Sequence, residues 1–298
     1  MTTAELKTLL NQYHFGANKT YGQNFLLNDS VLKKMVETAK LTKNDAVLEI
    51  GPGIGNLTKE LLENAKFVLS VEKDPKFLLI LKSLKKQYKN FRYEIADVLK
   101  FDFQKELSNL SSRPKWRDPS TSSRQVDTTL GMTLSYKVVA NIPYFITGKI
   151  IKVLLAAKFK PKSITMLVQK EVAQNIVAAP GKLNLLAISV QLYGKPVLAE
   201  IVRAADFYPA PKVDSAILHI ELYQKQKYDI ADEKKFFGIL HACFAGKRKQ
   251  LHNTLVNNLK LDKNEVSRIL QQLNINPAAR PQELKIQQWI DLANEIKI

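Results

Sequence analysis

Short runs of mostly apolar residues recur through the first half of the chain, and polar or helically spaced segments separate them. Four such runs lie at 46–50, 67–71, 92–96 and 138–140. Runs of this length that alternate with helical segments are typical of buried strands joined by crossover helices. The pattern therefore predicts an open α/β sheet, in which ligands bind where the strands end.

Helical spacing marks the start of the chain and its last part. Residues 3–15 carry apolar side chains at helical intervals, and Asp29 or Ser30 is expected to cap a second helix that runs to about Thr38. From about residue 231 the periodicity is helical to the end.

Two domains follow from this organisation. Residues 224–228 (Gln-Lys-Gln-Lys-Tyr) resemble a linker, so we expect an α/β domain over 1–224 and a smaller all-helical domain over 229–298. Residues 108–132 are rich in Ser, Thr, Pro and Arg with little apolar periodicity, which predicts a mobile, exposed insertion in the first domain.

A glycine-rich loop follows the first predicted strand. The strand runs into Gly51-Pro52-Gly53-Ile54-Gly55, and a helix is expected from Asn56. Residues without a Cβ let a ligand touch the backbone. The spacing is G-x-G-x-G, and not the G-x-G-x-x-G of dinucleotide enzymes. A cofactor without a pyrophosphate fits this loop better, and S-adenosylmethionine is the candidate.

Acidic residues end the next two strands. Glu72 can accept hydrogen bonds from both hydroxyls of a ribose, and Asp97 can accept one from an adenine amine. Either acid alone would be interpreted as a solvated surface carboxylate. Together with the glycine loop, they indicate a nucleoside-type cofactor site across three strand ends.

The fourth strand ends in Asn141-Ile142-Pro143-Tyr144. The Asn141 side-chain oxygen and the Ile142 carbonyl can accept the two N–H bonds of an exocyclic amine on a nucleobase, while Tyr144 offers a flat face. A stiff, proline-rich loop places Phe207 as a second aromatic plate. The alternatives are an ordinary strand-to-loop turn for this segment and a core position for Phe207.

Charge points to a polyanionic partner. The 298 residues carry 45 Lys and Arg against 28 Asp and Glu, a formal charge of +17. Nucleic acid is the natural partner for such a surface, although a lysine-rich proteome would also produce it. From residue 229 onward, 11 Lys and Arg minus 8 Asp and Glu leave +3, so most of the excess lies earlier in the chain.

Several other classes are excluded by composition. One cysteine, Cys243, allows no internal disulfide and indicates a reducing compartment. The histidines show no metal-ligand spacing, so no metal site is expected. No apolar run spans a bilayer, and the start of the chain lacks the order of a signal peptide. We expect a cytoplasmic protein that does not associate with membranes.

A basic cluster lies in the predicted helical domain. Lys247, Arg248 and Lys249 precede Gln250, His252 and Asn253. These donors suit phosphates and sugars, so the cluster is a candidate RNA-binding site. A lysine stripe at 82–89 shares one face of another predicted helix, and we interpret it as merely solvated.

The motifs occur in an order that resembles one family, the KsgA-type ribosomal RNA adenine dimethyltransferases. The resemblance covers nearly the whole chain except residues 108–132. The segments that carry it are Gly22 to Leu26, Glu49 to Thr58, Asn141 to Tyr144, Gln169 to Val172, Phe207 to Ser215 and a basic helix from Phe244 to Leu255.

The resemblance implies a Rossmann-like S-adenosylmethionine-dependent methyltransferase domain followed by a helical domain. Members dimethylate N6 of two adjacent adenosines in the 3′-terminal hairpin loop of small-subunit (16S) rRNA, so the expected partner is that RNA in a pre-30S particle. The cofactor contacts carried over are Asn24, Leu26, Gly51, Gly53, Glu72, Asp97 and Asn141. A monomer is expected, with a role in small-subunit biogenesis.

Three rival functions remain open. One is a large-subunit rRNA adenine methyltransferase of the macrolide-resistance type, against which the Lys212 to Ser215 run and the basic cluster argue. Another is a DNA adenine methyltransferase, which should carry a target-recognition domain. The third is a mainly non-catalytic ribosome assembly factor. The chain departs from the family pattern at 182–189, which leaves the RNA contacts there undefined.

Overall fold

The computed structural model forms two compact units. The first contains residues 1–170 and 198–222, and the second contains 171–197 and 223–298. The sequence placed 171–197 in the first domain, whereas these residues group with the C-terminal helices. The structure describes residues 1–13, 16, 22–103, 105–106, 135–246 and 248–297. The predicted insertion at 108–132 lies outside these ranges.

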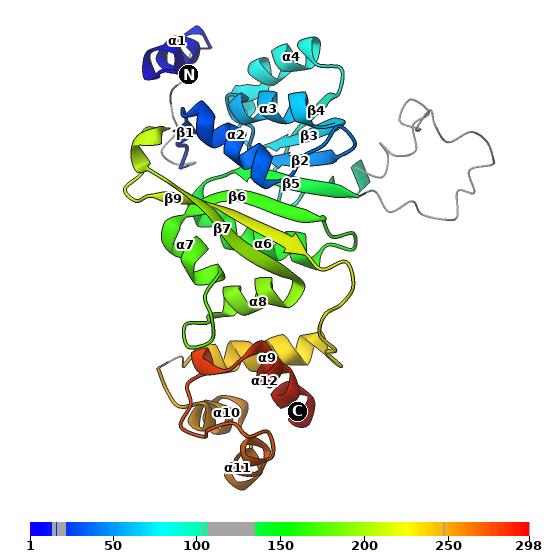
Figure 1. Cartoon of the computed structure of the whole chain (residues 1–298), viewed down its shortest axis with the longest axis vertical. Helices are drawn as coiled ribbons and strands as arrows, with labels where there is room; N and C mark the ends of the chain where they lie inside the picture. The colour runs from blue at the N-terminus through cyan, green and yellow to red at the C-terminus, as the bar shows by residue number, and fades with distance from the viewer. Residues whose placement is uncertain (14–15, 17–21, 104, 107–134, 247, 298) are drawn as a thin grey trace, which may run out of the picture. The chain divides into compact units, whose positions relative to one another are not determined.

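The first unit contains most of a seven-stranded sheet (Figure 1). The strand order is β4-β3-β2-β5-β6-β9-β7, in which β2 to β6 pair in parallel and β9 runs antiparallel to β6. The strands are β2 Ala46–Ile50, β3 Phe67–Glu72, β4 Phe91–Ile95, β5 Tyr136–Asn141, β6 Ser163–Gln169, β7 Gly194–Val202 and β9 Ser215–Leu222.

Apolar side chains on both faces explain why the central strands are buried. Val47, Leu48, Val68 and Leu69 are fully inaccessible, as expected for a parallel sheet covered on both sides. In Figure 1, α3 and α4 lie beside strands β2 to β4. The helices of this unit are α1 Thr3–Gln12, α2 Asp29–Thr38, α3 Asn56–Asn64, α4 Leu78–Gln87 and α6 Thr147–Ala156.

A small second sheet joins two loops that are far apart in the sequence. Strand β1 (Phe25–Leu26) pairs antiparallel with β8 (Phe207–Tyr208), with Leu26 opposite Phe207. This pairing brings the Asn24 loop next to the proline-rich loop, and both loops reach the functional site described below.

The second unit is helical and has its own core. Trp289, Phe236 and Leu240 are fully buried at its centre. The helices are α7 Lys170–Ile176, α8 Leu185–Tyr193, α9 Glu233–Phe244, α10 Leu251–Leu259, α11 Lys263–Gln272 and α12 Ile286–Glu295. None of the helices in the described part of the chain has both the length and the apolar character needed to span a membrane.

Two local predictions are wrong. The cap of α2 is Asn28, and not Asp29 or Ser30, because the Asn28 side chain accepts a hydrogen bond from the Ser30 N–H at 3.0 Å. The expected basic helix from Phe244 to Leu255 is interrupted. Helix α9 ends at Phe244 and α10 begins at Leu251, with a turn between them closed by Lys249 N–H donating to the Gly246 carbonyl.

Candidate active site

A pocket lies at the carboxyl ends of the parallel strands in the first unit. Strand β2 pairs with β3 on one side and with β5 on the other, so the strand order reverses at β2: β3 and β4 follow on one side of it, and β5 and β6 on the other. Such switch points are where open α/β sheets bind ligands. The pocket lining comes chiefly from segments 22–26, 50–57, 71–74, 96–99 and 141–146, together with Phe207.

The glycine loop gives the pocket a bare backbone wall. Gly51 and Gly53 have φ of +71° and +53°, which favours glycine over residues with a Cβ. A methyl group on Gly51 would lie 3.4 Å from Ile142 Cγ2 and 3.5 Å from the Asn141 carbonyl oxygen. The loop therefore approaches the end of β5 with little space for a side chain between them.

Glu72 is buried and held in place by the backbone. Its two carboxylate oxygens accept hydrogen bonds from Gly53 N–H at 3.0 Å and Asp74 N–H at 2.8 Å. Desolvation raises the pKa of Glu72, and these backbone hydrogen bonds oppose the rise. Each oxygen keeps lone pairs for further donors, such as the hydroxyls of a ribose.

Asp97 is more exposed and forms an ion pair. Its carboxylate lies 3.0 Å from Lys73 Nζ and accepts a second hydrogen bond from Leu99 N–H at 3.1 Å. The hydrogen bond from Lys73 is the main cause that lowers the pKa of Asp97. The side chain is therefore ionised at neutral pH and remains an acceptor on the pocket wall.

The end of β5 carries two candidate acceptors, the Asn141 side-chain oxygen and the Ile142 carbonyl. Asn141 is the last residue of β5, lines the pocket and is half-buried, while Ile142 is 4% exposed. No described residue forms a hydrogen bond with the Asn141 side chain or donates one to the Ile142 carbonyl. Both oxygens are thus available to a ligand with two N–H bonds.

Tyr144 and Phe207, the two aromatic residues predicted for the base, also line the pocket. The Tyr144 hydroxyl lies 2.6 Å from Ser215 Oγ, and burial raises the pKa of this tyrosine. Phe207 is 4% exposed and lines the same pocket from β8. Among the described residues, no ring contact joins the two side chains. Phe207 therefore belongs to both the core and the pocket wall.

Two further residues organise the site, and the sequence motifs did not mark either of them as functional. Glu49 is fully buried in β2, where its carboxylate accepts hydrogen bonds from the Thr58 and Ser70 hydroxyls. Burial raises the pKa of Glu49 to about 7. The sequence signal that could have identified Glu49 is an acidic residue within the apolar run Ala46–Ile50, because a buried acid needs hydrogen-bond partners.

Asp74 is the other residue. It is 3% exposed and accepts a hydrogen bond from Gln23 Nε2 at 3.0 Å, which ties the Asn24 loop to the end of β3. The Asp74-Pro75 pair in the sequence is a common turn signal. It gives no sign of the contact between Asp74 and Gln23.

Five predicted residues remain: Asn24, Leu26, Lys247, Arg248 and Lys249. Asn24 and Leu26 line the pocket, and Asn24 Nδ2 donates to the Gly22 carbonyl at 3.3 Å. Arg248 and Lys249 are exposed in the turn between α9 and α10 of the second unit. Lys247 lies outside the described residues.

Comparison with known sequences gives a consistent result. The family model described as "Ribosomal RNA adenine dimethylase" matches residues 14–297. A protein named "Ribosomal RNA small subunit methyltransferase A" from Dehalococcoides mccartyi is 38% identical over 292 residues, which cover 98% of this chain and 92% of that protein. A protein of the same name from Clostridium botulinum is 36% identical over 290 residues, 97% of each chain.

Solved structures support the fold. A dimethyladenosine transferase from Plasmodium falciparum superposes with a TM-score of 0.69 at 25% identity, covering 90% of this chain and 95% of that one. The 23S rRNA methyltransferase ErmE superposes with a TM-score of 0.67 at 25% identity, covering 91% and 99%. The Rossmann-like sheet followed by C-terminal helices is therefore confirmed.

Proposed function

Since the chain belongs to the ribosomal RNA adenine dimethylase family, we propose that it dimethylates N6 of two adjacent adenosines in the 3′-terminal hairpin loop of small-subunit rRNA. The methyl donor is S-adenosylmethionine. The observation that carries the proposal is the end of β5, where the Asn141 side chain lies in the pocket without a hydrogen-bond partner among the described residues, beside the glycine loop.

The pocket suits S-adenosylmethionine. Because Gly51 and Gly53 have no side chains, a ligand can contact the backbone of the glycine loop. Glu72 offers acceptors for the ribose hydroxyls, and Asp97 offers an acceptor for the adenine amine. Asn24 and Leu26 would cover the methionine end. When bound, the cofactor supplies an electrophilic methyl group on a sulfonium.

Asn141 and Ile142 prepare the nucleophile. The N6 lone pair of adenine is delocalised into the ring, which makes the amine a poor nucleophile. The Asn141 side-chain oxygen and the Ile142 carbonyl accept hydrogen bonds from the amine, which favours a more tetrahedral nitrogen. Positioning and electrostatics then supply the catalysis, and no side chain needs a pKa near neutrality to act as a base.

Tyr144 and Phe207 hold the target base. A base inside a helix is out of reach of the pocket, so it must leave its stack. Tyr144 lies at the end of the Asn141 segment and Phe207 in the β1–β8 ladder, and both line the pocket. Their rings provide apolar faces for the extruded adenine.

A second candidate is methylation of large-subunit rRNA. The likeness to ErmE favours it, because ErmE is a 23S rRNA methyltransferase. The higher identity to proteins named for the small subunit, at 36–38% over nearly the full chain, favours our first proposal.

Labelled S-adenosylmethionine and unmethylated ribosomal subunits separate these candidates. We expect label on small subunits, at two adjacent adenosines mapped by mass spectrometry of RNA fragments. Label on large subunits alone would replace the proposal with the second candidate. No label on either, with cofactor bound, would indicate an assembly factor.

Substitution of Asn141 tests the chemistry. We expect Asn141→Ala to lower kcat on small subunits by at least about 100-fold, because one transition-state hydrogen bond is commonly worth that much. Cofactor affinity, measured by calorimetry, should change little. Asn44→Ala, which alters an exposed asparagine outside the pocket, is the matched control. Full activity of Asn141→Ala would refute the assignment.

A further inference from the structure

We propose that Phe145 is a stacking platform for the base that flanks the target adenosine in the RNA. The inference rests on the proposed function and extends it, because it assigns a second subsite for the neighbouring purine. Tyr144 and Phe207 hold the reacting base, whereas Phe145 holds the nucleotide next to it.

The exposure of Phe145 is the first observation. The side chain is 69% exposed, the largest value among the exposed large apolar residues of the described chain, yet the residue lines the pocket. Scattered exposed apolar residues are common and need no function. This one lies at the mouth of the active site, directly after the tyrosine that offers a face to the target base.

The backbone holds Phe145 in a fixed position. Pro143 begins a 3-10 turn, Tyr144–Ile146, whose ends are joined by Ile146 N–H donating to the Pro143 carbonyl. One edge of the ring packs at Gly22, where a methyl group would lie 3.4 Å from Cε1 and 3.6 Å from Cδ1. A ring that already rests against the backbone along one edge has less entropy to lose when a base stacks on its face, which favours a binding role.

The charge around Phe145 suits RNA. Residues 141–160 contain no acidic residue and four lysines, at 149, 152, 158 and 160. Lys149 and Lys152 are exposed on the first turns of α6, which begins two residues after Phe145. An aromatic face in a segment that carries lysines and no acidic residue suits single-stranded nucleic acid, through stacking and phosphate contacts, while the acidic residues of the site, Glu72, Asp74 and Asp97, belong to other segments of the pocket lining.

The geometry favours the flanking base over the target base. Tyr144 is half-buried with its hydroxyl bonded to Ser215, while Phe145 is open to solvent. A base held at Tyr144 lies inside the pocket, so the exposed ring of Phe145 at the pocket mouth is left for the neighbouring nucleotide.

A substitution series at Phe145 tests the platform. We expect Phe145→Ala and Phe145→Leu to raise KM for unmethylated small subunits by about 10-fold with little change in kcat, because stacking contributes to substrate and transition state alike. Phe145→Tyr and Phe145→Trp should keep KM within about 2-fold, since they retain an aromatic face. Cofactor affinity serves as the check on folding.

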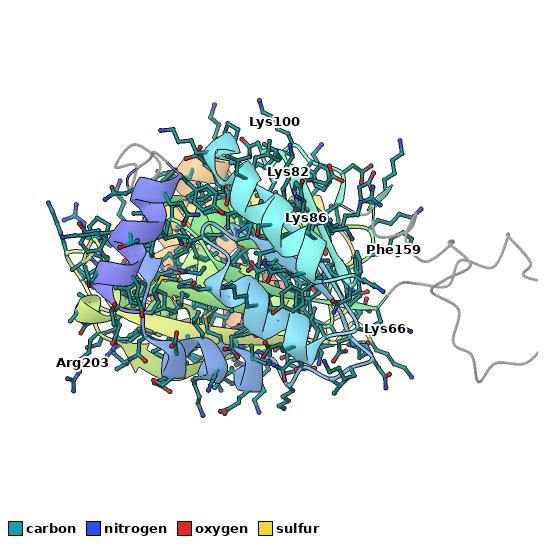
Figure 2. All side chains as sticks on the ribbon, turned by 90° about the horizontal axis from the view of Figure 1, so that it is seen from above. Lys66, Lys82, Lys86, Lys100, Phe159 and Arg203 are labelled. Carbon is teal, nitrogen blue, oxygen red and sulfur yellow. The ribbon has the colours of Figure 1, made fainter. Side chains whose placement is uncertain are left out.

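Phe159→Ala is the matched control. Phe159, which is labelled in Figure 2, is also exposed, at 39%, and lies on the same acid-free segment. It is not among the residues that line the pocket. The proposal is overturned if Phe145→Ala leaves KM unchanged, if Leu substitutes as well as Tyr, or if Phe159→Ala raises KM equally. If the wild-type protein and Phe145→Ala both methylate small subunits with the same KM, the stacking role of Phe145 is refuted and the proposed function stands. If the wild-type protein does not methylate small subunits, the proposed function and the stacking role of Phe145 are both refuted.

Discussion

Tyr144 depends on a residue far away in the sequence. Its hydroxyl lies 2.6 Å from Ser215 Oγ, and Ser215 is fully buried as the first residue of β9. Ser215 also lies opposite Gln169 in the antiparallel ladder with β6, so the sheet fixes its position. The tyrosine ring is thereby oriented from the far end of its side chain as well as from its backbone.

Removing this hydrogen bond should lower activity through the orientation of Tyr144. We expect Ser215→Ala to lower kcat on small subunits and to cost about 1–3 kcal/mol of unfolding free energy, because it leaves the tyrosine hydroxyl unpaired. Tyr144→Phe removes the same bond from the other side. In a double-mutant cycle, the loss in Ser215→Ala/Tyr144→Phe should be smaller than the sum of the two single losses. Additive losses in kcat would show that the bond does not position the ring.

At the scale of secondary-structure elements, Glu49 connects strand β2 to helix α3 and strand β3 beside the glycine loop. It lies in β2, and it accepts hydrogen bonds from Thr58 on α3 and Ser70 on β3. The carboxyl is fully inaccessible, and desolvation is the largest cause of its raised pKa, about 7. The helix after the glycine loop is thus tied to two strands through one titrating group.

The titration of Glu49 predicts a pH dependence of stability. Its folded pKa of about 7 lies above the ordinary 4.5, so its stabilising contribution is complete below pH 4.5 and is lost as pH rises through 7. The loss is on the order of 3 kcal/mol. Glu49→Gln stays neutral and should lose less unfolding free energy between about pH 5 and pH 8, as measured by urea denaturation. Parallel pH curves for both proteins would contradict this role.

Elements with strong local signals were predictable from the sequence. The strand Ala46–Ile50, the glycine loop and the helix that begins at Asn56 occur where the apolar run, the glycines and the helical spacing placed them. The strand ends at Glu72, Asp97 and Asn141 meet in one pocket because parallel strands share an edge.

Features that depend on long-range contacts were not predictable. The apolar segments from Leu185 to Leu192 and from Val197 to Val202 fit either a strand or a helix followed by a strand on local pattern alone, and the structure forms helix α8 and strand β7 there. The pairing of Tyr144 with Ser215 and that of Gln23 with Asp74 join segments that no local pattern connects. The cap at Asn28 was missed because three adjacent polar residues can all cap a helix.

For the whole molecule, charge is the dominant feature. The formal charge is +17, of which residues 229–298 contribute +3 and the rest of the chain +14. Exposed lysines occur widely in the first unit, including Lys82 and Lys86 on α4 (Figure 2). A high overall charge raises affinity for any RNA, so it does not by itself identify which basic residues contact phosphate.

Salt dependence can separate contact residues from general charge. Each phosphate contact adds nearly one unit to the slope of log affinity against log salt concentration. We expect Arg248→Ala/Lys249→Ala to reduce this slope for small subunits by about two between roughly 50 and 200 mM KCl, as measured by filter binding. Lys82→Ala/Lys86→Ala removes the same charge from an exposed helix face and should reduce the slope by less than about one unit. Equal reductions in both pairs would mean that the turn between α9 and α10 contributes only to the overall field, and an effect confined to the α4 pair would move the RNA contact to that helix.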